Sequence, residues 1–477
     1  MVGTIDLVVI ALYFVFILIV GMISYRKVNN ETDYSLAGRS LGYPTLIGAI
    51  TATAIGSGAT LGVGGLSYNF GIVVIWSIIA YALGLLGFSV IAGVIRRIKY
   101  WTIPEVLLAR YGNTARIISA VFLLLGLIAL FGVQVAALGT VFTAVGGTLW
   151  GVTYSQAVLV ARAVMIAYTF AGGMFALAYT EIVQAVLLLV ILGVLLPVFL
   201  FMGIDIGRVT ATLPSHMFDF FHGIPFYTLI GWFLTLIPIC FIDVSLWQRA
   251  SSARDEHVAK RSILVSTLLY FGYSLSIILV GIIGFYLYPS LKEIYGTNDV
   301  VVPILIINNL PPVMIGLSIA AILAVLMSTA ASVLMVAGMT VSRDVARLIK
   351  PDLKEKTALW TARIAVVAIG ALGITFSLLM RGIFEMMLLS FAIFIAVAFV
   401  PTMAALFWKK ATNTGAIASM IGGGITVVAL YGLKFTVGLP EWVEPIAGAL
   451  IVAVILMYVL SILTYKPGVT PQELSKT

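Results

Sequence analysis

Charged side chains are scarce in this sequence: Asp, Glu, Lys and Arg together make up 10% of its 477 residues. Soluble globular domains carry roughly 25% of these residues, so the composition excludes a water-soluble domain. Apolar residues take their place, at 62%, with a mean hydropathy of +1.16. Apolar runs of about 20 residues recur from end to end, and each is long enough to cross a bilayer as a helix. The composition therefore predicts an all-α polytopic membrane protein.

Cysteine and histidine are nearly absent as well. The single cysteine, Cys240, cannot form an intrachain disulfide. The three histidines stand in polar stretches and do not favour a transition-metal centre. The phosphate-binding pattern GxxxxGK followed by Ser or Thr does not occur. Any uphill work by this chain would therefore depend on an ion gradient.

The apolar runs divide into about thirteen predicted membrane spans, at residues 4–24, 43–70, 72–95, 116–147, 153–173, 176–203, 226–249, 261–288, 312–342, 358–380, 383–408, 413–433 and 442–465. With the amino terminus outside, the inward-facing loops and ends collect 22 of the 27 Lys and Arg residues, and the outward-facing ones collect four. This asymmetry follows the positive-inside rule and predicts a multi-pass plasma-membrane protein with a cytoplasmic carboxyl terminus. Topology thus explains the net charge of +8, and we expect no nucleic-acid partner.

A glycine-rich stretch, TATAIGSGATLGVGGLSY at residues 51–68, interrupts the second predicted span. Each interior glycine costs a helix about 1 kcal/mol relative to alanine. Within lipid, a broken helix is tolerated where its free backbone groups line a cavity or are buried in protein. Transporters use such breaks to bind cations and solutes. Close helix packing through small residues explains this segment equally well.

Three hydroxyl side chains, Ser328, Thr329 and Ser332, lie in the middle of the apolar run at 320–345. Ser328 and Ser332 share a helix face, with Thr329 beside them. Each hydroxyl could instead bond the carbonyl four residues back. In a chain that also has a loosened helix, the cluster favours a site for a hard cation such as Na⁺.

Charged residues within or beside the spans have two interpretations each. Glu181 either acts as a functional or paired acid, or lies in water at a helix amino terminus, where the macrodipole stabilises it. Asp243 either holds the amine of a solute or hydrogen-bonds a helix outside the pocket. Arg162, which lies within a span, either pairs with an anion or extends towards the membrane surface.

The segments AYTEIVQ, AVLMSTAAS and WQRASSA resemble the sodium:solute symporter family, and the similarity covers nearly the whole chain. The resemblance implies a single transporter domain over 1–477 with a LeuT-like fold. Two inverted five-helix repeats are expected at 43–203 and 226–408, with an extra helix in 1–25 and two more in 413–465. It also implies a secondary active transporter rather than an enzyme, working by alternating access as a monomer in the lipid bilayer.

The family's Na⁺ site is carried over to this chain as the backbone carbonyls of Ala52, Ile55 and Val325 with the hydroxyls of Ser328 and Thr329. Some members have a second Na⁺ site, which corresponds here to Glu181 and Ser332. Glu181 replaces the usual Asp, and Ala331 stands where a further hydroxyl can occur. These departures favour one Na⁺ in each cycle.

The family's solute-binding positions are mostly apolar in this chain. Leu236, Ile239 and Cys240 stand where sugar carriers place amides and aromatics, so each sugar hydroxyl would lose about 1–3 kcal/mol for want of a partner. Proline carriers place an acid at the position of Ala54.

The remaining polar groups are Ser57, Thr60 and Gln134, together with free backbone amides that suit a carboxylate. We therefore expect Na⁺-coupled symport of a short monocarboxylate or small amino acid. Choline, pantothenate or proline as solute, and proton coupling through Glu181, are the alternatives. A passive channel would need a continuous polar path, and the sequence shows no charged rings or filter-like repeats.

Overall fold

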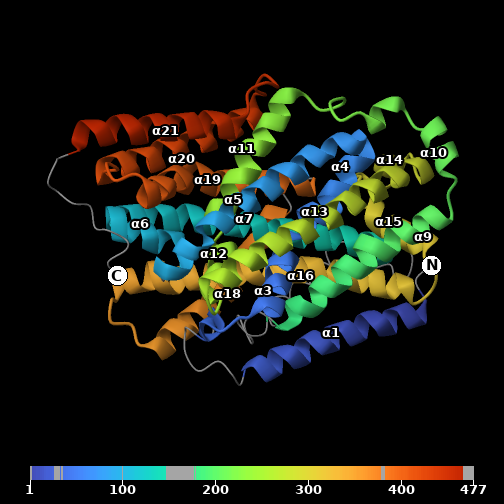
Figure 1. Ribbon diagram of the computed structural model, residues 1–477, viewed down its shortest axis with the longest axis horizontal. Coiled ribbons are helices and arrows are strands. Elements are labelled where there is room, and N and C mark those ends of the chain that lie inside the picture. The colour runs from blue at the N-terminus through green and yellow to red at the C-terminus, as the bar shows by residue number, and fades with distance from the viewer. Residues whose placement is uncertain are drawn as a thin grey trace.

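The computed structural model describes residues 3–25, 33, 36–98, 100–146, 177, 179–377 and 382–465. Within these residues the architecture is helical and contains no strand (Figure 1). Ten of the described helices are long and apolar enough to cross a membrane. A helix satisfies its own backbone hydrogen bonds, which lipid cannot do. The prediction of an all-α polytopic membrane protein is confirmed.

The described helices are, in chain order, α1 (Thr4–Tyr25), α3 (Tyr43–Ala54), α4 (Val63–Phe70), α5 (Ile75–Ile98), α6 (Ile103–Tyr111), α7 (Asn113–Gly146), α9 (Leu196–Met202), α10 (Ile206–Thr212), α11 (Phe226–Ile242), α12 (Val244–Ser252), α13 (Glu256–Leu287), α14 (Leu291–Tyr295), α15 (Val301–Asn309), α16 (Met314–Thr340), α17 (Arg347–Ile349), α18 (Glu355–Ser377), α19 (Ile383–Phe407), α20 (Asn413–Thr436) and α21 (Pro445–Thr464). Short 3₁₀-helical segments occur at η1 (Ala37–Arg39), η3 (Gly71–Val74) and η5 (Ser215–Phe218). Short π-helical segments occur at η2 (Gly58–Gly62), η4 (Leu188–Leu195) and η6 (Val341–Ala346). The helix Tyr179–Met202 contains η4 and α9.

Helix α16 lies inside the bundle. Every residue of its most apolar window is buried, whereas the outer helices α20 and α21 bury a third of theirs. It packs against α1, α7 and α18. Figure 1 shows α1 along one edge of the bundle and the α20–α21 pair along the opposite edge. The hydroxyl cluster predicted from the sequence is therefore carried by a helix that is shielded from lipid.

Two of the membrane helices that the structure describes are broken midway. The first ends as α3 at Ala54 and resumes in the π-helical turn η2 and α4, with Ile55 at φ −87° and ψ 74° leaving the helical path. The second is broken at Asp243, which has an extended backbone between α11 and α12. The glycine-rich stretch thus contains a helix break, one of the two interpretations that the sequence left open.

The amino terminus of α16 is capped by a residue of another helix. Val313, at the start of α16, has φ 71°, an unusual value for a β-branched residue, and its side chain provides no cap. Asp6 of α1 provides it: Oδ1 accepts hydrogen bonds from the backbone N–H groups of Val313 and Gly316, at 2.8 and 2.9 Å. The extra helix α1 therefore fixes the end of α16.

Part of the predicted topology falls outside the described residues. The expected span 153–173 and its Arg162 lie there, so the count of thirteen spans stays a prediction, as do the bounds of the two repeats. Helix α1 begins at one end of the bundle and α21 finishes at the other (Figure 1). This arrangement agrees with termini on opposite faces of the membrane, while the identity of the outer face stays a prediction.

Candidate functional site

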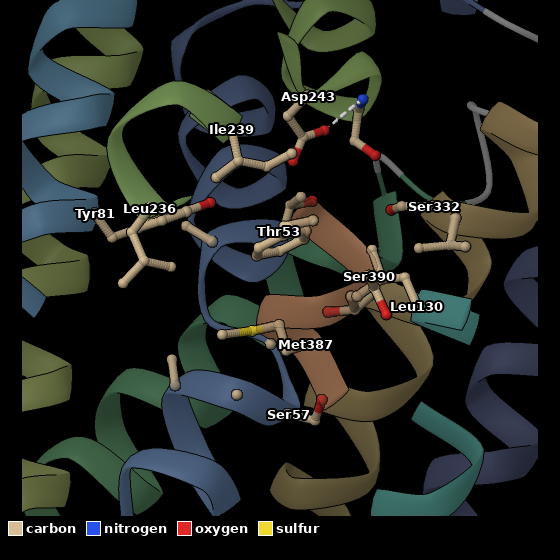
Figure 2. A pocket seen from close by; sticks show the side chains of 18 of the residues that line it. Thr53, Ser57, Tyr81, Leu130, Leu236, Ile239, Asp243, Ser332, Met387 and Ser390 are labelled. Carbon is tan, nitrogen blue, oxygen red and sulfur yellow. Dashed lines mark hydrogen bonds between the residues drawn. The ribbon is translucent and has the colours of Figure 1, made fainter. Parts of the chain in front are cut away.

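A cavity of about 100 Å³ lies between the two broken helices. Residues of α3, η2, α5, α7, α11, α12, α13, α16 and α19 line it (Figure 2). Much of the wall is apolar, with Leu130, Leu236, Ile239 and Met387 facing the space. The cavity therefore suits a small solute that is bound by few polar contacts.

Oxygen atoms from α3 and α16 converge at the break in the first helix. Ser328 Oγ lies 3.1 Å from the carbonyl oxygen of Ala52 and 3.0 Å from that of Val325. Thr329 Oγ1 lies 3.3 Å from the same Val325 oxygen. All four residues are buried. The Ser328–Ala52 contact joins the two helices, whereas the contacts with Val325 are bonds to a carbonyl three or four residues back, the alternative that the sequence left open.

Ile55, the fifth residue of that expected site, follows the last residue of α3 at the helix break. The next residue, Gly56, packs so closely that a Cβ there would lie 3.1 Å from Thr329 Oγ1. A glycine is thus favoured at this position because the broken helix approaches α16 directly. Neutral oxygens held at such a break are the ligands that transporters offer to Na⁺.

Glu181 and Ser332, expected as a second ion site, meet a guanidinium group. Arg249 Nη2 donates to Glu181 Oε1 and to Ser332 Oγ, the latter at 2.8 Å. The side chains of Arg249 and Glu181 are both fully buried. The interpretation of Glu181 as a carboxylate in water is therefore wrong, because no part of it reaches solvent.

Sequence reasoning missed the role of Arg249 and counted it among the basic residues of the inward-facing loops. It lies instead in the protein interior near the end of α12. The signal that could have found it is the WQRASSA segment, in which the Arg is part of the family resemblance. Its partners come from distant segments, so spacing along the chain could not reveal them.

The expected solute residues divide into two groups. Ser57, Gln134, Leu236 and Ile239 line the cavity. Ser57 Oγ and Gln134 Oε1 are buried without a hydrogen-bond partner among the described residues, so both are free to bind solute.

Thr60 and Cys240 are not brought to the cavity. Thr60 Oγ1 shares a hydrogen bond with the Tyr273 hydroxyl at 2.9 Å. Cys240 Sγ points towards α5, 3.7 Å from the carbonyl oxygen of Tyr81. The structure instead adds Tyr81 and Met387 to the cavity wall, which come from helices that sequence reasoning did not connect with it (Figure 2).

Asp243 lines the cavity and also caps α12. Its Oδ1 accepts hydrogen bonds from the backbone N–H groups of Ser245 and Leu246, at 2.7 and 3.2 Å. A carboxylate at this position is favourable because the first N–H groups of a helix lack intrahelical partners. Asp243 therefore hydrogen-bonds a helix, as one interpretation expected, but it does so from the wall of the cavity rather than from outside the pocket.

Two broken membrane helices that meet at a cavity beside a buried hydroxyl pair are features of a secondary transporter. The chain belongs to the sodium:solute symporter family, whose family model matches residues 34–423. It is therefore a transporter and not an enzyme.

Curated relatives in the family include two sodium/proline symporters. That of Haemophilus influenzae is 27% identical over 448 residues, which cover 89% of this chain and 88% of the relative. That of Staphylococcus aureus is 25% identical, over 97% of this chain and 93% of the relative.

Solved structures confirm the LeuT-like fold. A Na⁺-coupled sialic acid symporter in a substrate-bound outward-open state superimposes with a TM-score of 0.82 at 19% identity, over 97% of this chain and 98% of that one. Mhp1, a nucleobase-cation-symport-1 family transporter in a closed conformation, gives a TM-score of 0.56 at 14% identity, over 93% and 98%. At these identities the comparison shows the fold alone.

Proposed function

We propose that this chain couples the inward movement of one Na⁺ to that of a small organic solute, a short monocarboxylate or small amino acid. The observation that carries the ion site is the convergence of Ala52, Val325, Ser328 and Thr329 at the helix break. Family membership supports Na⁺ as the coupling ion.

Of these two solute classes, the polar groups of the cavity favour a small amino acid over a short monocarboxylate. The Ser57 hydroxyl can donate to a carboxylate, and the backbone amides at the start of η2, which follows Ser57, lie beside it. Gln134 Oε1 needs a donor, which an ammonium or imino group supplies and a simple carboxylate does not. The apolar wall would leave the hydroxyls of a sugar without partners.

Ion and solute are coupled because both bind at the same helix break. Na⁺ held between α3 and α16 links one helix from each of the two expected repeats, and it fixes the start of η2, which faces the solute. Such coupling requires different affinities in the outward and inward states, and it is reciprocal. A membrane potential of ~100 mV adds about 2.3 kcal/mol for each Na⁺ to the concentration gradient.

Uptake into proteoliposomes tests this function. Radiolabelled lactate, alanine, proline, choline and pantothenate are offered under an inward Na⁺ gradient and under an equal K⁺ gradient. We expect Na⁺-dependent uptake of alanine or lactate, lost in Ser328→Ala/Thr329→Ala and retained in Ser318→Ala, a buried serine on the same helix. Uptake driven by a proton gradient without Na⁺ would contradict the proposal and favour proton coupling.

A further inference from the structure

Arg249 forms the most extensive buried polar contact near the candidate ion site. Besides Glu181 and Ser332, it reaches two backbone carbonyls: Nε donates to Ala49 O at 3.1 Å, and Nη1 donates to Ser245 O at 3.2 Å. The four acceptors belong to α3, α12, α16 and the helix Tyr179–Met202. One guanidinium therefore joins four segments of the chain in a site without solvent exposure.

The contacts of Arg249 repeat those of the candidate ion site one helical turn away. The ion site joins Ala52 of α3 to Ser328 of α16, and Arg249 joins Ala49 of α3 to Ser332 of α16. Ser332 Oγ also donates to the carbonyl oxygen of Ser328, at 2.8 Å, so the two sites share a residue. Both sites thus link α3 to α16. The positive charge of Arg249 makes the link in one site, and the candidate ion site offers a place for a cation in the other.

The surroundings of the guanidinium are those of a small-cation site. Glu181 Oε2 is buried without a hydrogen-bond partner among the described residues. Thr53 faces the same carboxylate and lines the cavity together with Ser332. A carboxylate and two hydroxyls are hard oxygen ligands, and they need a cation because a lone buried carboxylate is strongly destabilised.

We infer that Arg249 is a built-in cation that occupies this second oxygen cluster and excludes Na⁺ from it. The inference rests on the proposed function for the number of ions transported, and it explains why one Na⁺ suffices. The fixed charge of Arg249 fastens α3 and α12 to α16, while the exchangeable ion binds one turn away. Without the guanidinium, the cluster of Glu181, Ser332 and Thr53 becomes an additional Na⁺ site.

Equilibrium binding of ²²Na⁺ to the purified full-length protein tests this inference. We expect one bound ion in the wild type and two in Arg249→Gln, which removes the charge but keeps an unbranched polar side chain. Arg249→Lys retains a positive charge and should bind one. Glu181→Gln/Arg249→Gln lacks the carboxylate and should also return to one, so the gained ion is assigned to Glu181.

Other results separate the two proposals. If the wild type binds no Na⁺, the proposed ion site at Ser328 and Thr329 fails, whereas a single ion gained by Arg249→Gln still supports the inference. If folded Arg249→Gln binds the same number of ions as the wild type, the inference is overturned.

The folding of the variant is informative as well. If Arg249→Gln folds only in the presence of Na⁺, the ion replaces the lost charge, as inferred. If the variant stays unfolded at every Na⁺ concentration while Arg249→Lys folds, Na⁺ cannot replace the guanidinium, and the inference is wrong.

Discussion

Asp299 is one group through which we expect pH to act on this protein. It lies just before α15, 9% exposed, and its Oδ2 accepts a hydrogen bond from the backbone N–H of Ile383 at 3.0 Å, at the start of α19. It also packs against α4, where a Cβ on Gly65 would lie 2.5 Å from Asp299 Oδ1. The Asp299 carboxyl thus links the connecting segment to the start of α19 and lies against the second half of the broken helix.

Burial raises the pKa of the Asp299 carboxyl from 3.8 to about 7, with a smaller contribution from the charge of Glu385. Because the folded state holds its proton to a higher pH than the unfolded chain does, stability is greatest at low pH and falls as pH rises through 7. Between pH 6 and pH 8 the unfolded carboxyl is fully ionised while the folded one loses its proton. The free energy of unfolding should therefore fall by about 1.4 kcal/mol in this window.

The measurement is the thermal unfolding temperature of purified protein at a series of pH values from 6 to 8. Asp299→Asn keeps an acceptor for the Ile383 N–H and cannot ionise, so this component of the pH dependence should disappear. Glu293→Gln, an exposed carboxyl on the nearby α14, is the control and should retain the wild-type slope. An Asp299→Asn variant with an unchanged slope, or a wild type that gains stability as pH rises from 6 to 8, would refute the reasoning.

Three further predictions concern single side chains. Asp6→Ala removes the cap of α16 and leaves buried N–H groups unpaired, so the free energy of unfolding should fall by about 2–4 kcal/mol in denaturant titrations; no loss would show that the cap is dispensable. Gly48→Ala would place a Cβ 2.9 Å from the Ile182 Cα, costing about 1–3 kcal/mol by the same measurement, whereas Gly272→Ala has nothing within 4 Å and should be neutral or stabilising. Asp243→Asn should retain solute uptake because the amide oxygen still caps α12, while Asp243→Ala should reduce it; loss in both would instead favour a charge contact with the solute.

The sequence predicts the features that follow from composition and backbone chemistry. Apolar runs of about 20 residues define the membrane helices because a helix of that length crosses the bilayer with all its backbone hydrogen bonds satisfied internally. The glycines at 56 and 58 predict the break in the first helix, since they loosen it where α16 approaches. The hydroxyls of Ser328 and Thr329 predict a candidate ion site because both interrupt a single apolar run of the sequence.

Features that depend on contacts between distant segments could not be predicted. Arg249 meets Glu181 and Ser332 across 68 and 83 residues of sequence, so no local pattern contains the pair. Thr60 turns towards Tyr273 because it lies in the π-helical turn η2, where the 3.6-residue period that relates side-chain directions no longer holds. The break at Asp243 has no glycine to mark it and is stabilised by the capping carboxylate instead.

The most direct test of the Na⁺ site is the thermal stability of the purified protein in NaCl and in KCl at equal ionic strength. An ion that binds only the folded state stabilises it by about 2.7 kcal/mol at one hundred times its dissociation constant. We predict a Na⁺-specific stabilisation that is absent from Ser328→Ala/Thr329→Ala and preserved in Ser318→Ala. Equal stability in the two salts, or a Na⁺ effect that survives the double substitution, would contradict the assignment of the ion to the break between α3 and α16.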